Sequence, residues 1–136
     1  MPTTNGSAQA TTAGTISGGT YSVQFATGNG TLTMQTGALL QGPALGGDTS
    51  HIILEGTGSA SNDFLKFGSL DMVGSQWTLL GRTEARDSTV SNGRLIIGSP
   101  GTSGAIFVGD SATIKPGTEM VGYNSTVQAN VTNQGT

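Results

Sequence analysis

The chain is built from short apolar runs that end at glycine, and this pattern limits the folds open to it. The phrases "SHIILEG" at 50–56, "SQWTLLG" at 75–81 and "GAIFVG" at 104–109 show it most clearly. Glycine occurs 23 times in 136 residues. No window of about 11 residues carries helical apolar spacing without a glycine interruption. The pattern therefore predicts an all-β protein made of short strands.

Ten runs of this kind are predicted as strands, each bounded by Gly, Asn, Asp or Ser. They are 21–26, 31–35, 51–55, 63–67, 76–80, 94–97, 105–108, 112–114, 119–121 and 126–131.

Recurring phrases indicate how these strands are arranged. "NGTLTM" begins at residue 29 and "NGRLII" at residue 92, a spacing compatible with three coils of roughly 21 residues. In a parallel β-helix each coil pairs with the coils above and below it, so few charges are needed, and only 10% of the residues are charged. We expect a parallel β-helix with about 20 residues per coil and irregular loops.

The expected helix covers residues 21–136. Residues 1–20, "MPTTNGSAQATTAGTISGGT", are uncharged and low in complexity. They are predicted to be either a flexible leader or an irregular first coil, and the sequence leaves both open.

Residues 75–136 resemble the C-terminal passenger region of Gram-negative bacterial type V autotransporters. The family's phrases W-x-L-x-G, V-x-x-G-x-L-x-V-G and a Gly-Thr/Val/Asn ladder are matched here. The matching residues are Trp77, Leu79, Gly81, Val90, Gly93, Leu95, Ile97, Gly98, Gly117, Thr118, Gly122, Val127, Asn130, Val131, Asn133, Gly135 and Thr136.

The resemblance implies a right-handed β-helix passenger that is exported with the help of its own membrane β-barrel. It places the chain at the bacterial cell surface or outer membrane, or outside the cell after export. The segment nearest the barrel is expected to nucleate passenger folding, in the manner of an autochaperone. Two departures stand out: "KPG" at 115–117 replaces a plainer glycine turn, and the chain stops before the family's Pro-Gly. The stop at Thr136 is interpreted as a boundary just before the linker to the barrel.

The expected function is a non-enzymatic structural or adhesin segment that forms a rigid cell-surface stalk, of the kind associated with virulence. Its expected partners are a host surface or matrix component, a second copy meeting it through the solenoid ends, and the chain's own barrel. Two alternatives remain: a glycan-binding module, or a fragment of a polysaccharide-degrading enzyme. The five basic residues form no run, so no nucleic-acid partner is expected.

No catalytic, cofactor-binding or metal-binding residue is predicted. The single histidine, His51, has no triad partner at a characteristic distance and is interpreted as a strand-edge residue. The stretch "GRTEARDS" at 81–88 is the most charged in the chain. It is predicted to be a solvated loop and the best candidate for a contact surface, through Arg82, Glu84, Arg86 and Asp87.

Eight apolar residues are predicted to fill the interior of the coils. They are Trp77, Leu79, Leu95, Ile97, Phe107, Ile114, Val127 and Val131.

Overall fold

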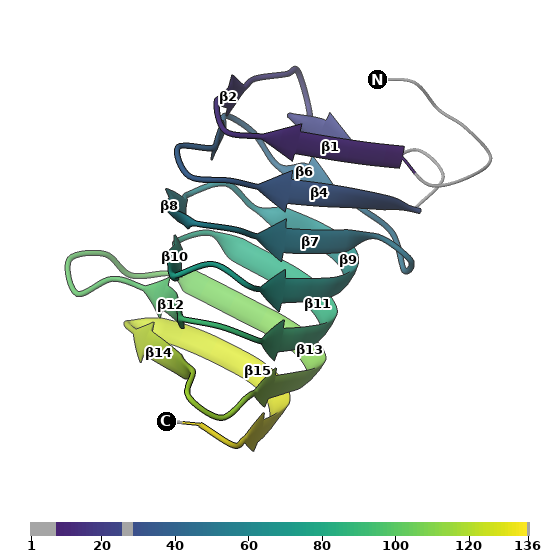
Figure 1. The fold of residues 1–136 in the computed structure, drawn as a ribbon. Helices are drawn as coiled ribbons and strands as arrows, with labels where there is room; N and C mark the ends of the chain where they lie inside the picture. Colours follow the sequence, from purple (N-terminus) through teal and green to yellow (C-terminus); the bar gives the residue numbers. More distant parts are fainter. Residues whose placement is uncertain (1–7, 26–28, 136) are drawn as a thin grey trace.

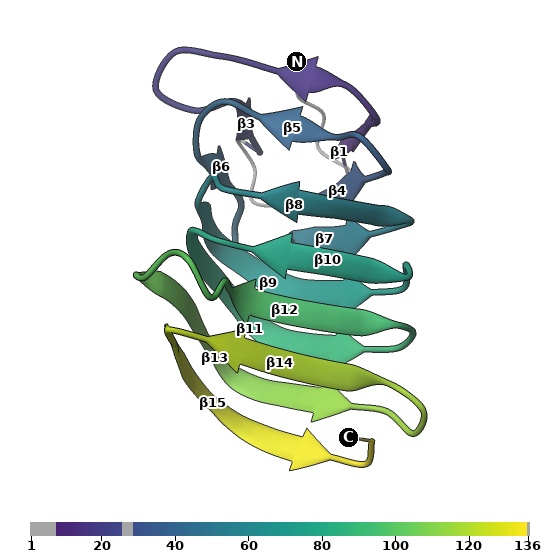
Figure 2. The same ribbon diagram turned by 90° about the vertical axis from the view of Figure 1, so that its left-hand side faces the viewer.

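The protein is a parallel β-solenoid. The computed structural model describes residues 8–25 and 29–135, and throughout these residues every regular element is a β-strand. The strands stack in about six turns, with equivalent strands roughly 20 residues apart. Figures 1 and 2 show the chain winding in a right-handed sense from the N-terminal to the C-terminal end. The predicted parallel β-helix is confirmed.

Fifteen strands form the coils. They are β1 (Ala8–Thr12), β2 (Thr15–Ile16), β3 (Val23–Gln24), β4 (Gly30–Met34), β5 (Leu39–Leu40), β6 (Ala44–Leu45), β7 (His51–Leu54), β8 (Thr57–Ala60), β9 (Phe64–Met72), β10 (Gln76–Leu79), β11 (Arg82–Val90), β12 (Arg94–Gly98), β13 (Ala105–Ile114), β14 (Glu119–Tyr123) and β15 (Ser125–Asn133).

Three sheets form the sides of the solenoid. The largest runs β1-β4-β7-β9-β11-β13-β15, and β3 and β6 join it beside β9. A second sheet runs β8-β10-β12-β14, and β2 pairs with β5. The described part of region 1–20 is thus a first coil, since β1 pairs with β4 and β2 with β5. Residues 1–7 of that region lie outside the described residues.

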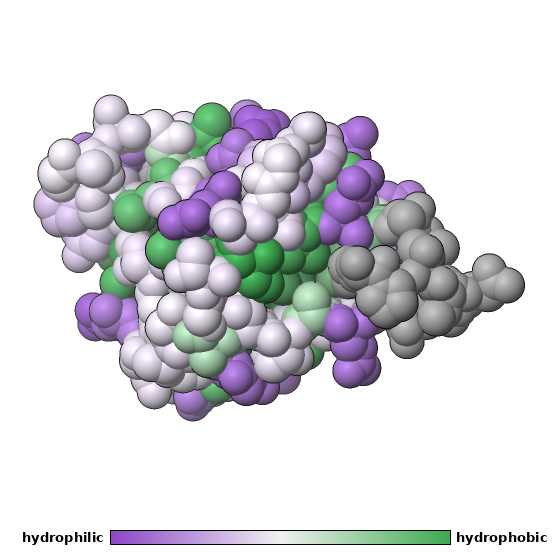
Figure 3. All heavy atoms as spheres, turned by 90° about the horizontal axis from the view of Figure 1, so that it is seen from above, coloured by the Kyte–Doolittle hydropathy of each residue, from purple (hydrophilic) through white to green (hydrophobic). Residues whose placement is uncertain are grey.

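The core lies along the axis because side chains alternate inward and outward along each strand. Strand β4 shows the strict alternation, with Leu32 and Met34 buried. The register then places equivalent positions of successive coils beside one another, so that Leu32 pairs with Ile52 and Ile52 with Leu70. Seen from above, apolar side chains occupy the middle of the section and polar ones surround them (Figure 3). Each buried side chain of this size contributes about 2 kcal/mol.

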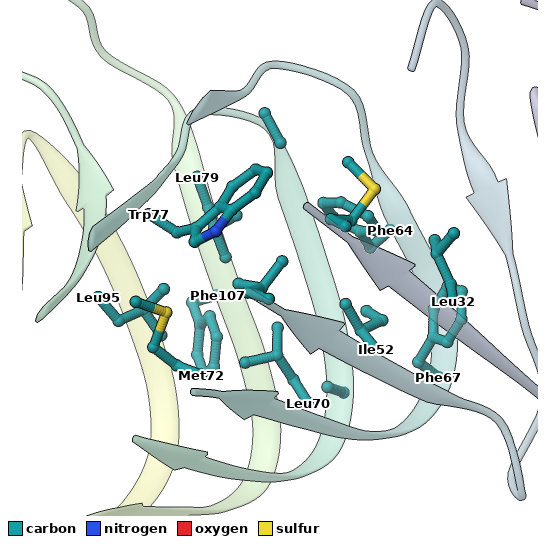
Figure 4. Close-up of a cluster of buried hydrophobic side chains, with 14 of the residues drawn as sticks. Leu32, Ile52, Phe64, Phe67, Leu70, Met72, Trp77, Leu79, Leu95 and Phe107 are labelled. Atoms are coloured by element: carbon teal, nitrogen blue, oxygen red, sulfur yellow. The ribbon is translucent and has the colours of Figure 1, made fainter. Parts of the chain in front are cut away.

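Trp77 shows how neighbouring coils fit one another. It is fully buried, and its register partner in the coil above is Gly58. A Cβ atom at Gly58 would lie 2.5 Å from the indole ring, so only glycine leaves room for the tryptophan. The indole Nε1–H donates to the carbonyl oxygen of Glu55 at 2.9 Å, which satisfies its one polar group. Figure 4 shows Trp77 within the core cluster.

The strands lengthen toward the C-terminus. Strands β1 to β8 contain two to five residues, whereas β9, β11, β13 and β15 contain nine or ten. Each long strand continues around a corner of the section (Figure 2). In β9 and β13 a glycine allows the backbone to approach the coil above closely: a Cβ atom at Gly68 would lie 2.1 Å from the carbonyl oxygen of Asp48, and one at Gly109 2.2 Å from that of Ala85.

The predicted core is correct except at the last strand. The side chains of Trp77, Leu79, Leu95, Ile97, Phe107 and Ile114 are buried.

The prediction was wrong for Val127 and Val131, which are 39% and 50% exposed. Their register partners are Phe107 and Ala112, both buried, so the valines lie in interior rows as the alternation requires. They are exposed because the described residues provide no coil below β15.

A buried serine on the inward side of β11 has a hydroxyl without a hydrogen-bond partner among the described residues. This residue, Ser88, is buried between its register partners Leu70 and Ala112. Burying an unpaired hydroxyl disfavours folding, because the group loses its bonds to water and gains none in return.

Replacing Ser88 with alanine is therefore expected to raise the free energy of unfolding by about 1 kcal/mol. Ser59→Ala, at an exposed position of β8, is the control and is expected to change it by less than about 0.5 kcal/mol. Urea unfolding followed by circular dichroism measures both. A destabilised Ser88→Ala variant would contradict the assignment of an unpaired hydroxyl.

Candidate functional site

Hydrogen bonds of side chains and backbone join six charged residues of β9, β11 and the segments that precede β7 and β9, and we call this group the charged corner. It consists of Asp48, Asp63, Lys66, Arg82, Glu84 and Arg86. Of the four residues predicted as a contact loop, three belong to it, and the fourth, Asp87, follows Arg86 in the same strand.

Hydrogen bonds that Glu84 accepts and Arg82 donates join β11 to the coil above. Arg82 Nε donates to Glu84 Oε2 at 2.7 Å. The other carboxylate oxygen, Glu84 Oε1, accepts from the backbone N–H of Lys66 at 3.2 Å. The backbone N–H of Arg82 donates to Asp63 Oδ1 at 2.9 Å. Both acidic side chains thus accept backbone N–H groups across the coil boundary.

Lys66 marks an irregularity in the ladder. Its φ is +60°, a left-handed conformation that costs roughly 1–2 kcal/mol for a residue with a side chain. The register between β9 and β11 shifts at the same place, between Thr83 and Ala85. The bond from its N–H to Glu84 therefore compensates for a locally strained backbone.

Arg86 reaches further along the solenoid. Its Nη2 donates to the carbonyl oxygen of Asp48 at 3.1 Å, and Asp48 lies in the turn that precedes β7. The side chain therefore connects β11 to a turn beyond the neighbouring strand β9.

The loop prediction for "GRTEARDS" was wrong, because Arg82–Val90 is a single strand. Its inward positions hold Thr83, Ala85, Ser88 and Val90, all buried. Three of these are small or polar, so the sequence shows little of the apolar alternation that indicates a strand. The charged residues at the outward positions are typical of a solvated loop. The structure shows that these charges contact neighbouring coils.

A second group lies on the outer side of the largest sheet, and we call it the polar column. The register places His51 beside Ser69, Ser69 beside Asp87, and Asp87 beside Ser111. His51 Nδ1 and Ser69 Oγ are 2.5 Å apart. Ser111 Oγ donates to Asp87 Oδ1 at 2.8 Å. The polar column therefore consists of two hydrogen-bonded pairs, each of which joins successive coils.

The polar column contains the residue types of a catalytic triad in an order that does not form one. A triad requires histidine between the serine and the carboxylate. Here Ser69 lies between His51 and Asp87, and Asp87 bonds to Ser111. His51 stands at the start of β7 and is exposed, as a strand-edge residue would be.

A neighbouring outer column runs parallel to this one. The register aligns Thr33, Ile53, Asp71, Thr89 and Thr113. Ser91 Oγ donates to Asp71 Oδ1 at 2.6 Å. Neither column contains an aromatic side chain on which a sugar ring could stack.

No sequence pattern predicted Ser69 and Ser111 as the partners of His51 and Asp87. They lie far apart in the chain and no local motif joins them. The signal that could have found them is the coil register itself, which brings positions about one turn apart to adjacent places.

In residues 8–25 and 29–135 no group of three or more His, Asp or Glu side chains could hold a metal ion. In the same ranges no helix is long and apolar enough to cross a membrane.

Comparisons of the chain with protein-family models, with curated proteins and with solved structures found no match.

The charged corner predicts a specific stability effect. Glu84→Ala is expected to lower the free energy of unfolding by about 1 kcal/mol, since Lys66 N–H loses its acceptor and Arg82 its ionic partner. Glu84→Gln keeps an acceptor oxygen without the charge, and we expect it to lose roughly half as much. Thermal and urea unfolding compare the three proteins. If Glu84→Ala is as stable as the parent protein, the charged corner does not hold the coils together.

Proposed function

We propose that the chain is a non-enzymatic structural segment of a bacterial autotransporter passenger. In this role it forms a rigid stalk at the cell surface, and its C-terminal coils nucleate the folding of the coils before them. The stalk role is supported by the continuous ladder of parallel pairs that runs from β1 to β15. The autotransporter assignment itself is carried by the resemblance of residues 75–136.

The observation that carries the folding role is the difference between the two halves of the solenoid. Strands of nine or ten residues pair along most of their length from β9 to β15. Most pairs among β1 to β8 join only two to five residues. A fold dominated by non-local parallel pairing is slow to start. Each pair of strands forms only after the chain between them has closed into a loop, and a long pair gains more stabilisation from that closure than a short one. The C-terminal half, which has the longest pairs, is therefore the favoured place for a nucleus.

The charged and polar outer groups support a structural role more than a contact role. Arg82, Glu84 and Arg86 make bonds within the solenoid. The two alternatives, a glycan-binding module or a polysaccharide-degrading enzyme, have less support. The outer columns lack aromatic side chains, and the polar column lacks the order of a triad.

Two buried leucines provide a matched test of the nucleus. Leu95 lies in β12 and Leu32 in β4, and both are fully buried. Substitution of either by alanine is expected to cost about 2–5 kcal/mol. If the C-terminal coils nucleate, Leu95→Ala slows folding with a φ-value of about 0.5 or more, whereas Leu32→Ala mainly speeds unfolding with a φ-value below about 0.3.

Stopped-flow folding and unfolding in urea measures both φ-values. The reverse order, with Leu32 high and Leu95 low, would place the nucleus in the N-terminal coils. The assignment to the autotransporters has a separate test in the gene. A reading frame that continues beyond Thr136 into a membrane β-barrel supports it, and a gene that encodes no such barrel contradicts it.

A further inference from the structure

The turn between β11 and β12 contains the dipeptide Asn92–Gly93. The Asn92 side chain crosses the boundary between two coils there. Its Nδ2 donates to the carbonyl oxygen of Gly74 at 2.9 Å and to that of Val73 at 3.3 Å. Asn92 is also exposed to solvent. The side-chain amide therefore joins this turn to the turn that precedes β10, at a position that water reaches.

The packing of the turn leaves room only for glycine after Asn92. A Cβ atom at Gly93 would lie 2.2 Å from the carbonyl oxygen of Ser75 and 2.5 Å from that of Gly74. The φ angle of Gly93 is +66°, in the left-handed region that glycine adopts without strain. The next residue, Arg94, donates its backbone N–H to the carbonyl oxygen of Ser75 at 3.0 Å. The fold thus requires an asparagine that is followed directly by glycine.

This dipeptide is chemically labile, because glycine has no side chain to shield its backbone nitrogen. The Gly93 nitrogen attacks Cγ of Asn92, so that the N–Cγ bond forms and the Cγ–Nδ2 bond breaks. Nδ2 leaves as ammonia and takes the proton of the Gly93 N–H. Water then opens the resulting succinimide ring at either of its carbonyl carbons. The product is aspartate or isoaspartate, and water is the only co-reactant.

The folded turn opposes this reaction. Nδ2 is the leaving nitrogen, and its two hydrogen bonds to the coil above hold the Asn92 side chain in place. The attacking nitrogen is held as well, because Arg94 pairs with Ser75 directly after it. The turn has to open before the Gly93 nitrogen reaches Cγ. The rate of deamidation therefore follows the fraction of molecules in which the turn is open.

The product no longer supports the turn. An ionised carboxylate accepts hydrogen bonds and donates none. Aspartate at position 92 therefore places negatively charged oxygen atoms beside the carbonyl oxygens of Gly74 and Val73, where the amide donated before. Isoaspartate also lengthens the main chain just before Arg94, whose N–H pairs with Ser75. Both products favour the open turn.

From these observations we infer that Asn92 is a modification site, at which spontaneous deamidation releases the turn that joins two successive coils. The folded solenoid slows the reaction, and a deamidated turn opens more readily than the original one. Because ammonia is lost to solvent, the change is irreversible, and deamidated turns accumulate as the protein ages. This modification goes beyond the proposed stalk role and does not depend on it.

Peptide mapping by mass spectrometry measures the reaction itself. The parent protein is incubated at mildly alkaline pH, in native buffer and in urea above the unfolding transition. Deamidation at Asn92 is expected in urea, and its rate in native buffer is expected to be at least about tenfold lower. Asn92→Gln is the control, because its longer side chain forms the cyclic imide far more slowly. Equal rates in the two buffers, or no deamidation at Asn92 in urea, would overturn the inference.

Two substitutions measure the effect of the product on the turn. Asn92→Asp is expected to lower the equilibrium constant for folding by about tenfold or more, because it removes the donor and adds a charge. Asn92→Ala is the matched control, which removes the donor without adding a charge, and it is expected to lower the constant by only about threefold. Urea unfolding followed by circular dichroism compares both with the parent protein. An Asn92→Asp protein as stable as the parent, or more stable than Asn92→Ala, contradicts the release of the turn.

Discussion

Parallel backbone pairing between coils, kept in register, is the constraint on which the rest of this structure depends. Once Leu32, Ile52 and Leu70 occupy equivalent places on successive coils, the alternation along each strand creates a continuous apolar interior. The same register creates the polar column on the outer side. It also explains why glycine is so frequent, since coils in contact leave no room for a side chain at positions such as Gly58.

The fold could be predicted from the sequence because its signals are local. Apolar runs closed by glycine indicated strands and turns, and recurring phrases indicated a coil of about the observed length. The extent of β11 could not be predicted in the same way, because its inward residues Thr83, Ala85 and Ser88 are small or polar. Their burial depends on the coils above and below, which no local pattern describes.

The candidate site was less predictable than the fold. The side chains of Arg82, Glu84 and Arg86 looked available for a partner, yet each bonds within the solenoid. His51 and Ser69 are brought together by the register alone. At Val127 and Val131 the alternation predicted the correct row, but burial requires a further layer beneath β15. Pattern therefore determines which way a side chain faces, whereas its environment depends on the neighbouring coil.

Coil-to-coil pairing is longest in the C-terminal half, where β9, β11, β13 and β15 lie, and we infer that it is also strongest there. Native-state hydrogen exchange tests this most directly, because it measures the free energy of opening at each amide. The account predicts that paired amides of β10 to β13 exchange only through global unfolding, while those of β2 to β6 exchange through smaller local openings. Equal protection in both halves, or stronger protection in β2 to β6, would contradict it.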